Sequence, residues 1–142
     1  MARFLGRVDD DSVHFFDPLP AGVEVHGFRP HGEVCHQMAS ADLNLLLLEQ
    51  VEKAPWLFTG KVFEYFGAGR PILMIGPPDC PLADMVRESG LGRVCSNESA
   101  LIARELTDYL EGKWTVQPNR EFLARFDVRR QTAKLAEIFA KL

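Results

Sequence analysis

"TGKVFEYFGAGRPILMIG", residues Thr59–Gly76, is the stretch of sequence that decides the fold. Its first half carries a lysine and a glutamate among aromatic side chains, and its second half ends in the apolar run Pro71–Gly76. A run that is apolar at nearly every position is typical of a strand whose two faces are both covered by helices. The stretch therefore predicts a helix that leads into a buried strand of a parallel sheet.

The same alternation of apolar runs and helical patterns extends over the chain. Strands are predicted at Val23–Gly27, Leu43–Leu48, Pro71–Gly76 and Arg93–Ser96, with further candidates at Arg3–Gly6 and Val13–Phe16. Helices are predicted near Gly32–Ala39, Gly60–Ala68, Leu82–Ser89 and Glu98–Glu111, and again over about residues 119–142. This order predicts an α/β fold with a Rossmann-like, doubly wound parallel sheet, built as a single domain over residues 1–142.

Polar residues are expected at the starts of two of these helices. Asn97 is predicted to cap the helix that ends at Gly112, and Asp127 is predicted to be the N-cap of the last helix. An apolar stripe follows in that last helix, formed by Val128, Leu135, Ile138, Phe139 and Leu142.

Composition limits the class of protein. The chain has 142 residues, of which 46% are hydrophobic and 25% charged, as in an ordinary globular domain. A formal charge of −4 without a basic stripe argues against nucleic acid as a partner. We expect a cytoplasmic protein, because neither a membrane span nor a secretory signal is recognised. The cysteines Cys35, Cys80 and Cys95 form no disulfide pattern and are expected to be free thiols.

The start of the helix at Gly60 is the candidate binding site. Ligands of open α/β sheets bind beyond the carboxyl ends of the strands, where helix N-termini point their N–H groups. Thr59 and Gly60 are expected as cap and first-turn residues, and Lys61 adds a point charge for a phosphate. Glu64 can accept hydrogen bonds from the vicinal hydroxyls of a ribose. A helical wheel places Val62, Phe63, Phe66 and Gly67 on the side that packs on the sheet, and Lys61, Glu64, Tyr65 and Ala68 on the other.

From the residues alone, Lys61 and Glu64 can equally be a solvated i,i+3 pair worth ~0.2–0.5 kcal/mol. A resemblance favours the binding site. The segments "VHGFRPHGEVCHQMASADLNLLLL", "GKVFEYFGAGRPIL" and "ESGLGRVCSNESALIAREL" together resemble the C-terminal, donor-binding lobe of GT-B glycosyltransferases of the family-4 (group 1) type. The resemblance covers about residues 23–110, in the family's order of elements.

The resemblance implies a site for a nucleotide-diphosphate sugar. A glutamate at the place of Glu64 contacts the ribose in this family, and donors at the helix start hold the diphosphate. The turn after the strand at Val23–Gly27 cradles the base, which implicates Gly27, Phe28 and Arg29, with His31 near the base or the sugar. The implied function is that of the donor-binding lobe of a glycosyltransferase that moves a sugar onto an unidentified acceptor.

The chain departs from the family in two ways. Many members carry another glutamate eight positions before Glu64, where this chain has Trp56. The acceptor-binding N-terminal lobe, which supplies the base in inverting members, has no counterpart here, so the catalytic residues are not identified and the chain is expected to be inactive alone. The expected partners are the nucleotide sugar and either the missing lobe or a separate chain, with a homodimer as an alternative in isolation. Contact with the inner face of the membrane would involve the missing lobe.

Neither a cofactor nor a metal is implied. His31, Cys35 and His36 lie close in sequence, but their spacing matches no zinc site. Cys80 is expected to be structural, whereas Arg70 and Arg93 are either cleft cations or solvated strand ends. Two alternative functions stay open: a non-catalytic binding subunit of a split glycosyltransferase, and a GT-B-fold sugar-nucleotide epimerase that uses the same donor geometry.

Overall fold

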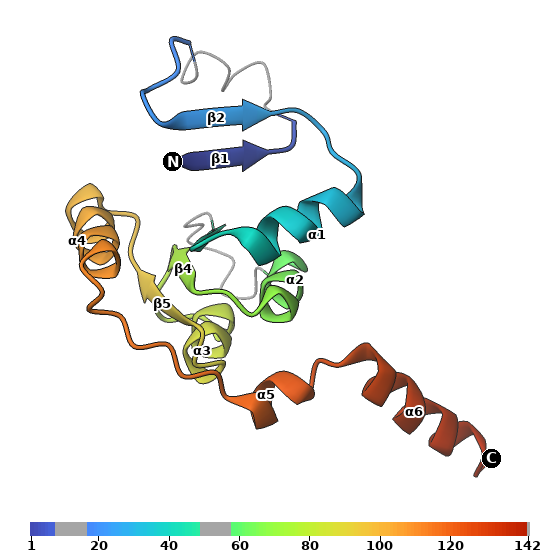
Figure 1. The fold of residues 1–142 in the computed structure, drawn as a ribbon. Coiled ribbons are helices and arrows are strands. Elements are labelled where there is room, and N and C mark those ends of the chain that lie inside the picture. Colours follow the sequence, from blue (N-terminus) through green and yellow to red (C-terminus); the bar gives the residue numbers. More distant parts are fainter. Residues whose placement is uncertain (8–16, 49–57, 142) are drawn as a thin grey trace. The chain divides into compact units, whose positions relative to one another are not determined.

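A computed structural model of the chain describes residues 1–7, 17–48 and 58–141. These residues form a mixed α/β structure with two parallel sheets and six helices (Figure 1). They divide into two compact units, Met1–Ser40 and Ala41–Leu142, and each is described by itself. The expectation of a single domain over residues 1–142 therefore stays a prediction. The candidate strand at Val13–Phe16 lies outside the described residues.

The first unit contains a two-stranded parallel sheet and one helix. Strand β1 (Ala2–Leu5) pairs with β2 (Val23–His26), with Ala2 opposite Val23 and Leu5 opposite His26. Helix α1 (His31–Ser40) follows β2 after a short connection. The structure thus confirms strands at the first candidate segment and at "VEVH", and a helix after them.

The second unit is built on a three-stranded parallel sheet. Its strands are β3 (Asn44–Leu47), β4 (Ile72–Ile75) and β5 (Gly92–Cys95), in the spatial order β3-β4-β5. The register places Leu47 opposite Ile75 and Ile75 opposite Cys95. All four residues of the central strand β4 are buried. This confirms a parallel sheet whose middle strand comes from the apolar run "ILMI".

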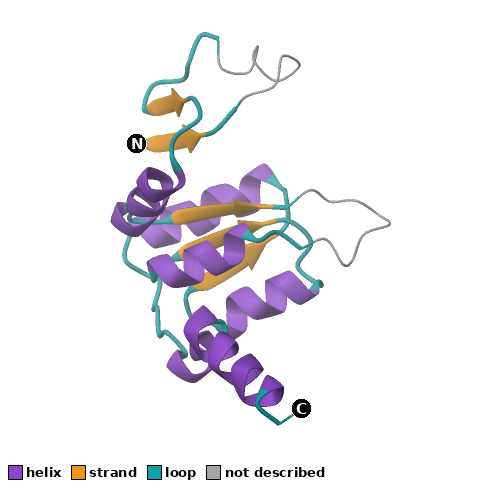
Figure 2. Ribbon diagram, turned by 90° about the vertical axis from the view of Figure 1, so that its right-hand side faces the viewer, coloured by secondary structure: helices purple, strands orange, loops and turns teal. Residues whose placement is uncertain are grey.

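Helices cover both faces of this sheet. Helix α2 (Lys61–Ala68) connects β3 to β4, and α3 (Pro81–Glu88) connects β4 to β5. Both connections step in the same direction across the sheet, and right-handed crossovers of this kind place their helices on the same face. Helix α4 (Ser99–Leu110) follows β5 and packs on the opposite face, where Leu101, Ile102 and Leu106 meet Leu73, Ile75 and Cys95. The strands lie between the two layers of helices in Figures 1 and 2.

Glycine permits the close packing of α3 against the sheet. A Cβ on Gly92 would overlap the Ile72 carbonyl oxygen and would come 2.8 Å from Cγ1 of Val86 in α3. Real Cβ atoms do not approach other atoms this closely, so the strand and the helix are packed at a distance that only glycine allows. Leu82, Ala83 and Val86 of α3 are accordingly fully buried.

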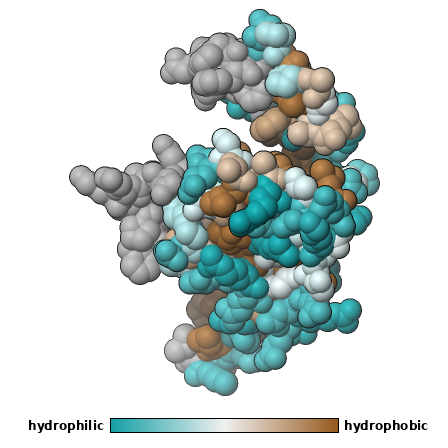
Figure 3. Space-filling view, turned by 90° about the vertical axis from the view of Figure 1, so that its left-hand side faces the viewer, coloured by the Kyte–Doolittle hydropathy of each residue, from teal (hydrophilic) through white to brown (hydrophobic). Residues whose placement is uncertain are grey.

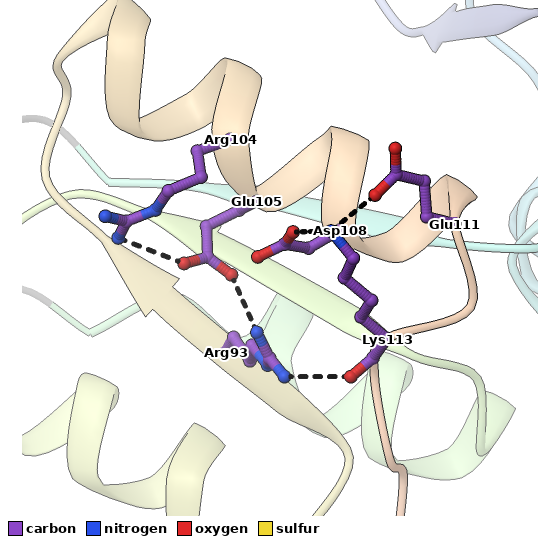
Figure 4. A network of polar contacts seen from close by, with 6 residues as sticks. All are labelled: Arg93, Arg104, Glu105, Asp108, Glu111 and Lys113. Atoms are coloured by element: carbon purple, nitrogen blue, oxygen red, sulfur yellow. Dashed lines mark hydrogen bonds and ion pairs between the residues drawn. The ribbon is translucent and has the colours of Figure 1, made fainter.

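An ion-pair network ties α4 to the last strand and to the segment after it (Figure 4). The guanidinium of Arg93 donates to Glu105 at 3.3 Å and to the Lys113 carbonyl at 3.4 Å, and it lies 5.0 Å from the centre of the Trp114 ring. Arg104 pairs with the other oxygen of Glu105 at 3.5 Å. Arg93 therefore joins β5 to α4 and to the segment after it, and its expected role as a cleft cation stays a prediction.

The chain ends in two helices, α5 (Arg120–Ala124) and α6 (Val128–Phe139). The Asp127 carboxylate accepts a hydrogen bond from the Arg129 N–H at 2.9 Å, which confirms the predicted N-cap. The Asn97 prediction was wrong, because α4 has its N-cap position at Glu98 and no side-chain cap bond there. Among the described helices none is long and apolar enough to cross a membrane. Hydrophilic residues dominate the face drawn in Figure 3.

Candidate functional site

The carboxyl ends of β3, β4 and β5 form one edge of the second unit. The Leu48 N–H donates to the Ile75 carbonyl at 2.9 Å, and the Gly76 N–H donates to the Cys95 carbonyl at 3.0 Å. A Cβ on Gly76 would lie 2.8 Å from the Leu48 carbonyl oxygen, so the chain segments meet closely at this edge. Helices α2, α3 and α4 begin in the segments that follow these strand ends.

The N-cap residues of these three helices make no side-chain cap bond. Their N-cap positions are Gly60, Cys80 and Glu98, and in the described residues none of the three donates or accepts a side-chain cap bond. Helices α5 and α6, by contrast, are capped by the side chains of Asn119 and Asp127. The N–H groups of an uncapped first turn need another acceptor, and the helix dipole favours an anion there. The helix dipoles therefore favour negative charge at this edge.

The start of α2 carries the predicted phosphate-binding residues. The Lys61 N–H reaches the Thr59 hydroxyl oxygen at 3.4 Å, a long contact that a closer acceptor can replace. The Val62 N–H donates to the Thr59 carbonyl at 3.3 Å and the Phe63 N–H donates to the Gly60 carbonyl at 3.1 Å. A Cβ on Gly60 would meet no atom within 4 Å, so the space around this backbone is open. The side chain of Lys61 is exposed.

Glu64 lies one turn into α2 and is half-buried. The pKa of the neighbouring Tyr65 phenol is raised to about 12, mainly by burial and to a smaller extent by the negative charge of Glu64. Thr59, Gly60, Lys61 and Glu64 thus lie within two turns of one helix start. They are near one another because they are neighbours in the sequence, so their role in binding stays a prediction.

The helical wheel was wrong for Tyr65, which was placed on the polar side of α2. Tyr65 is 7% exposed, and its hydroxyl donates to the Leu45 carbonyl of β3 at 2.9 Å. Phe63, placed on the buried side, is 41% exposed. The buried face consists of Val62, Tyr65 and Phe66, at i, i+3 and i+4 spacing. A tyrosine can occupy such a face because its ring is apolar and its hydroxyl finds a backbone acceptor.

The other predicted residues follow β2 in the first unit. Phe28 is 86% exposed, and Arg29 lies 3.8 Å from Glu33, measured from Nε to the carboxylate oxygen. The His31 ring nitrogen lies 3.5 Å from the Cys35 sulfur, one turn along α1. Gly27 has no neighbour within 4 Å of a Cβ position. These residues are near one another in sequence and lie in a different unit from Lys61 and Glu64.

The first unit also contains a polar cluster that was not predicted from the sequence. The Glu24 carboxylate accepts hydrogen bonds from Arg3 Nε at 3.0 Å and from His26 Nε2 at 3.1 Å, and these two bonds, His26 first, lower the pKa of Glu24. A hollow of about 270 Å³ adjoins the cluster and is lined by Arg3, Leu5, Glu24, His26, Arg29, Glu33 and Gln37. Because successive side chains of a strand point to opposite faces, the sequence "VEVH" already indicates that Glu24 and His26 share a face.

The cysteines behave as expected from their number. All three are free thiols, and Cys80 and Cys95 are buried. The Cys80 thiol donates to the Pro77 carbonyl at 3.4 Å, which fits a structural role at the turn into α3. Burial raises the pKa of the Cys95 thiol. Trp56, the residue at the place of the family's other glutamate, lies outside the described residues.

No protein-family model matches the chain, and no curated protein matches it significantly. The assignment of a function therefore depends on the residues and geometry described above.

Proposed function

We propose that this chain is a donor-binding lobe of a GT-B glycosyltransferase and that it binds a nucleotide-diphosphate sugar. One observation carries the proposal. The start of α2, whose N-cap residue Gly60 makes no side-chain cap bond, lies at the carboxyl edge of a parallel sheet and bears Lys61 and Glu64. This is the place where open α/β sheets bind ligands, and both charged residues suit different parts of a nucleotide.

The diphosphate is assigned to the backbone at Gly60 and Lys61 and to the Lys61 ammonium. The Lys61 N–H makes only a long contact of 3.4 Å to the Thr59 hydroxyl, which a phosphate oxygen can replace, and the open space at Gly60 allows a ligand to approach the backbone. Phosphates at helix N-termini are stabilised by these N–H groups and by the helix dipole. An exposed lysine adds a charge that can follow the phosphate.

The ribose is assigned to Glu64. Its backbone is held in place because the next residue, Tyr65, is buried and hydrogen-bonded to the Leu45 carbonyl of β3. A half-buried carboxylate in a fixed position can accept hydrogen bonds from two vicinal hydroxyls, and such charge-assisted bonds are stronger than neutral ones. The base contacts at Gly27, Phe28, Arg29 and His31 are implied by the resemblance alone, and the proposal does not depend on them.

The proposal divides the reaction between two lobes. This chain would supply the donor site, and acceptor binding would come from another lobe or a partner chain. No cofactor or metal takes part in the proposal. A non-catalytic subunit of a split transferase would use the same donor contacts, and a sugar-nucleotide epimerase of this fold would use them for a different reaction.

Equilibrium titration of the chain with UDP, GDP and ADP, and with their sugar conjugates, tests the proposal. We expect saturable binding of at least one nucleoside diphosphate, with the base preference seen also for its sugar conjugate. Absence of binding to all three would refute the donor site. Product analysis after incubation with the preferred sugar conjugate separates the alternatives, because an epimerase would change the sugar without any acceptor.

A further inference from the structure

Helix α6 presents an apolar face to solvent. Val128, Leu135, Ile138 and Phe139 are between 51% and 71% exposed, and none of the helix residues is buried in the described structure. At ~100° per residue these four side chains fall within one arc of less than half the circumference of the helix. Exposed apolar residues scattered singly are normal, but four on one face of a 12-residue helix mark a surface that has a partner.

Basic side chains border this face. On the same wheel, at ~100° per residue, Lys134 and Lys141 lie about 40–60° from one edge of the apolar arc, Arg129 and Arg130 lie about 80° from its two edges, and Gln131 falls inside it. The chain as a whole has a formal charge of −4. Over residues 125–141, five cationic residues outnumber two acidic ones: Arg125, Arg129, Arg130, Lys134 and Lys141 against Asp127 and Glu137. The positive charge is therefore concentrated beside the apolar face.

We propose that α6 binds the surface of an anionic lipid bilayer. A helix with an apolar face, a cationic border and low overall hydrophobicity lies in the plane of the interface, with its apolar side chains among the acyl chains. The long stems of lysine and arginine let their charges reach the headgroup phosphates from the borders of the buried face. The helix is too short and too polar to cross the bilayer, which agrees with an in-plane orientation.

Charge favours a lipid surface over a second copy of the chain as the occupant. Two α6 helices packed through their apolar faces would bring two cationic borders together, and like charges at such a distance repel. An anionic bilayer presents the opposite charge along the whole length of the helix. This inference does not depend on the nucleotide site of α2.

Vesicle co-sedimentation of the full chain tests the inference. The probe is a phosphatidylcholine vesicle with or without phosphatidylglycerol, at low and at high salt. We expect binding to the anionic vesicle only, weakened by salt. Replacing both Arg130 and Lys134 by glutamine should weaken binding about fivefold for each charge. Phe139→Ser should weaken it about tenfold or more, since a large apolar side chain is lost from the interface.

Two variants outside α6 are matched controls. Leu110→Ser removes a side chain that is 82% exposed at the end of α4, and Arg104→Gln removes an exposed charge from the same helix. Both should bind the anionic vesicle like the wild type. The inference would be overturned if the chain bound both vesicles equally or bound neither. It would also be overturned if the control variants lost as much vesicle binding as the α6 variants. Concentration-dependent dimers that Phe139→Ser abolishes, without vesicle binding, would overturn it in favour of a second copy.

Discussion

Tyr65 links the candidate site to the sheet at the scale of a single residue. Its hydroxyl donates to the Leu45 carbonyl of β3, and this bond also holds the backbone of the neighbouring Glu64 in place. A phenylalanine would fill the same apolar space but would leave the carbonyl without this donor. The hydroxyl of Tyr65 is therefore the part of the residue that positions α2 on β3.

The pH dependence of stability reports on this residue. The pKa of Tyr65 is raised from 10.0 to about 12 in the folded chain, so its contribution is complete below pH 10 and is lost as the pH rises toward 12. The loss should amount to about 2–3 kcal/mol. Tyr65→Phe should cost about 1 kcal/mol at neutral pH and should remove this component of the pH dependence. Urea unfolding of the wild type and of Tyr65→Phe across this pH range measures the difference in the free energy of unfolding. If the free energies of the two chains changed in parallel with pH, the prediction would be contradicted.

Glu64→Gln tests the proposed ribose contact. The substitution keeps the shape of the side chain but removes its charge, so nucleotide binding should weaken by about 1–3 kcal/mol while the free energy of unfolding changes little. Glu88→Gln is the matched control, because Glu88 lies at the other end of its helix, α3, away from the carboxyl edge. Calorimetric titration of the three chains with the preferred nucleoside measures the effect. If Glu64→Gln bound the nucleoside as tightly as the wild type, Lys61 and Glu64 would be better explained as a solvated ion pair.

At the scale of elements, the packing of α3 on β5 depends on the absence of a side chain at Gly92. Gly92→Ala should destabilise the chain by about 1–3 kcal/mol, because its Cβ would overlap the Ile72 carbonyl. Gly67→Ala is the control, since Gly67 lies within α2 and its Cβ would meet nothing within 4 Å. That control should stabilise the chain by about 0.5–1 kcal/mol. Thermal unfolding distinguishes the two, and equal shifts of the same sign would refute the packing argument.

The elements were predictable where the local pattern is strong. Leu73, Met74 and Ile75 continue an apolar run, and the structure buries this strand on both faces. The helical wheel misplaced Tyr65 because tyrosine is amphipathic and can lie on either face of a helix. Its acceptor on β3 is 20 residues away in the chain, so no local pattern shows it. The Arg3 contact with Glu24 depends on strand register, which no local pattern specifies. The helix start at Thr59–Glu64 was predictable because its residues are contiguous.

At the scale of the whole molecule, we propose that this chain takes one part of a two-part reaction. A lobe that binds the donor but does not position an acceptor lacks the proximity on which transfer depends. We therefore expect no measurable sugar transfer by the purified chain with any nucleotide sugar that it binds. Incubation with the radiolabelled donor and chromatography of the products measures this, and robust transfer would show that the active site has been misplaced.

Lys61→Ala tests the central claim, that the start of α2 holds the phosphates of a nucleotide, most directly. Calorimetric titration compares the wild type, Lys61→Ala and the control Lys134→Ala from α6, each with a nucleoside and with its diphosphate, at low and at high salt. The account predicts that Lys61→Ala weakens diphosphate binding far more than nucleoside binding, and that salt reduces the difference because an exposed charge is screened. Lys134→Ala should bind both ligands like the wild type. Equal affinity of wild type and Lys61→Ala for the diphosphate would contradict the account.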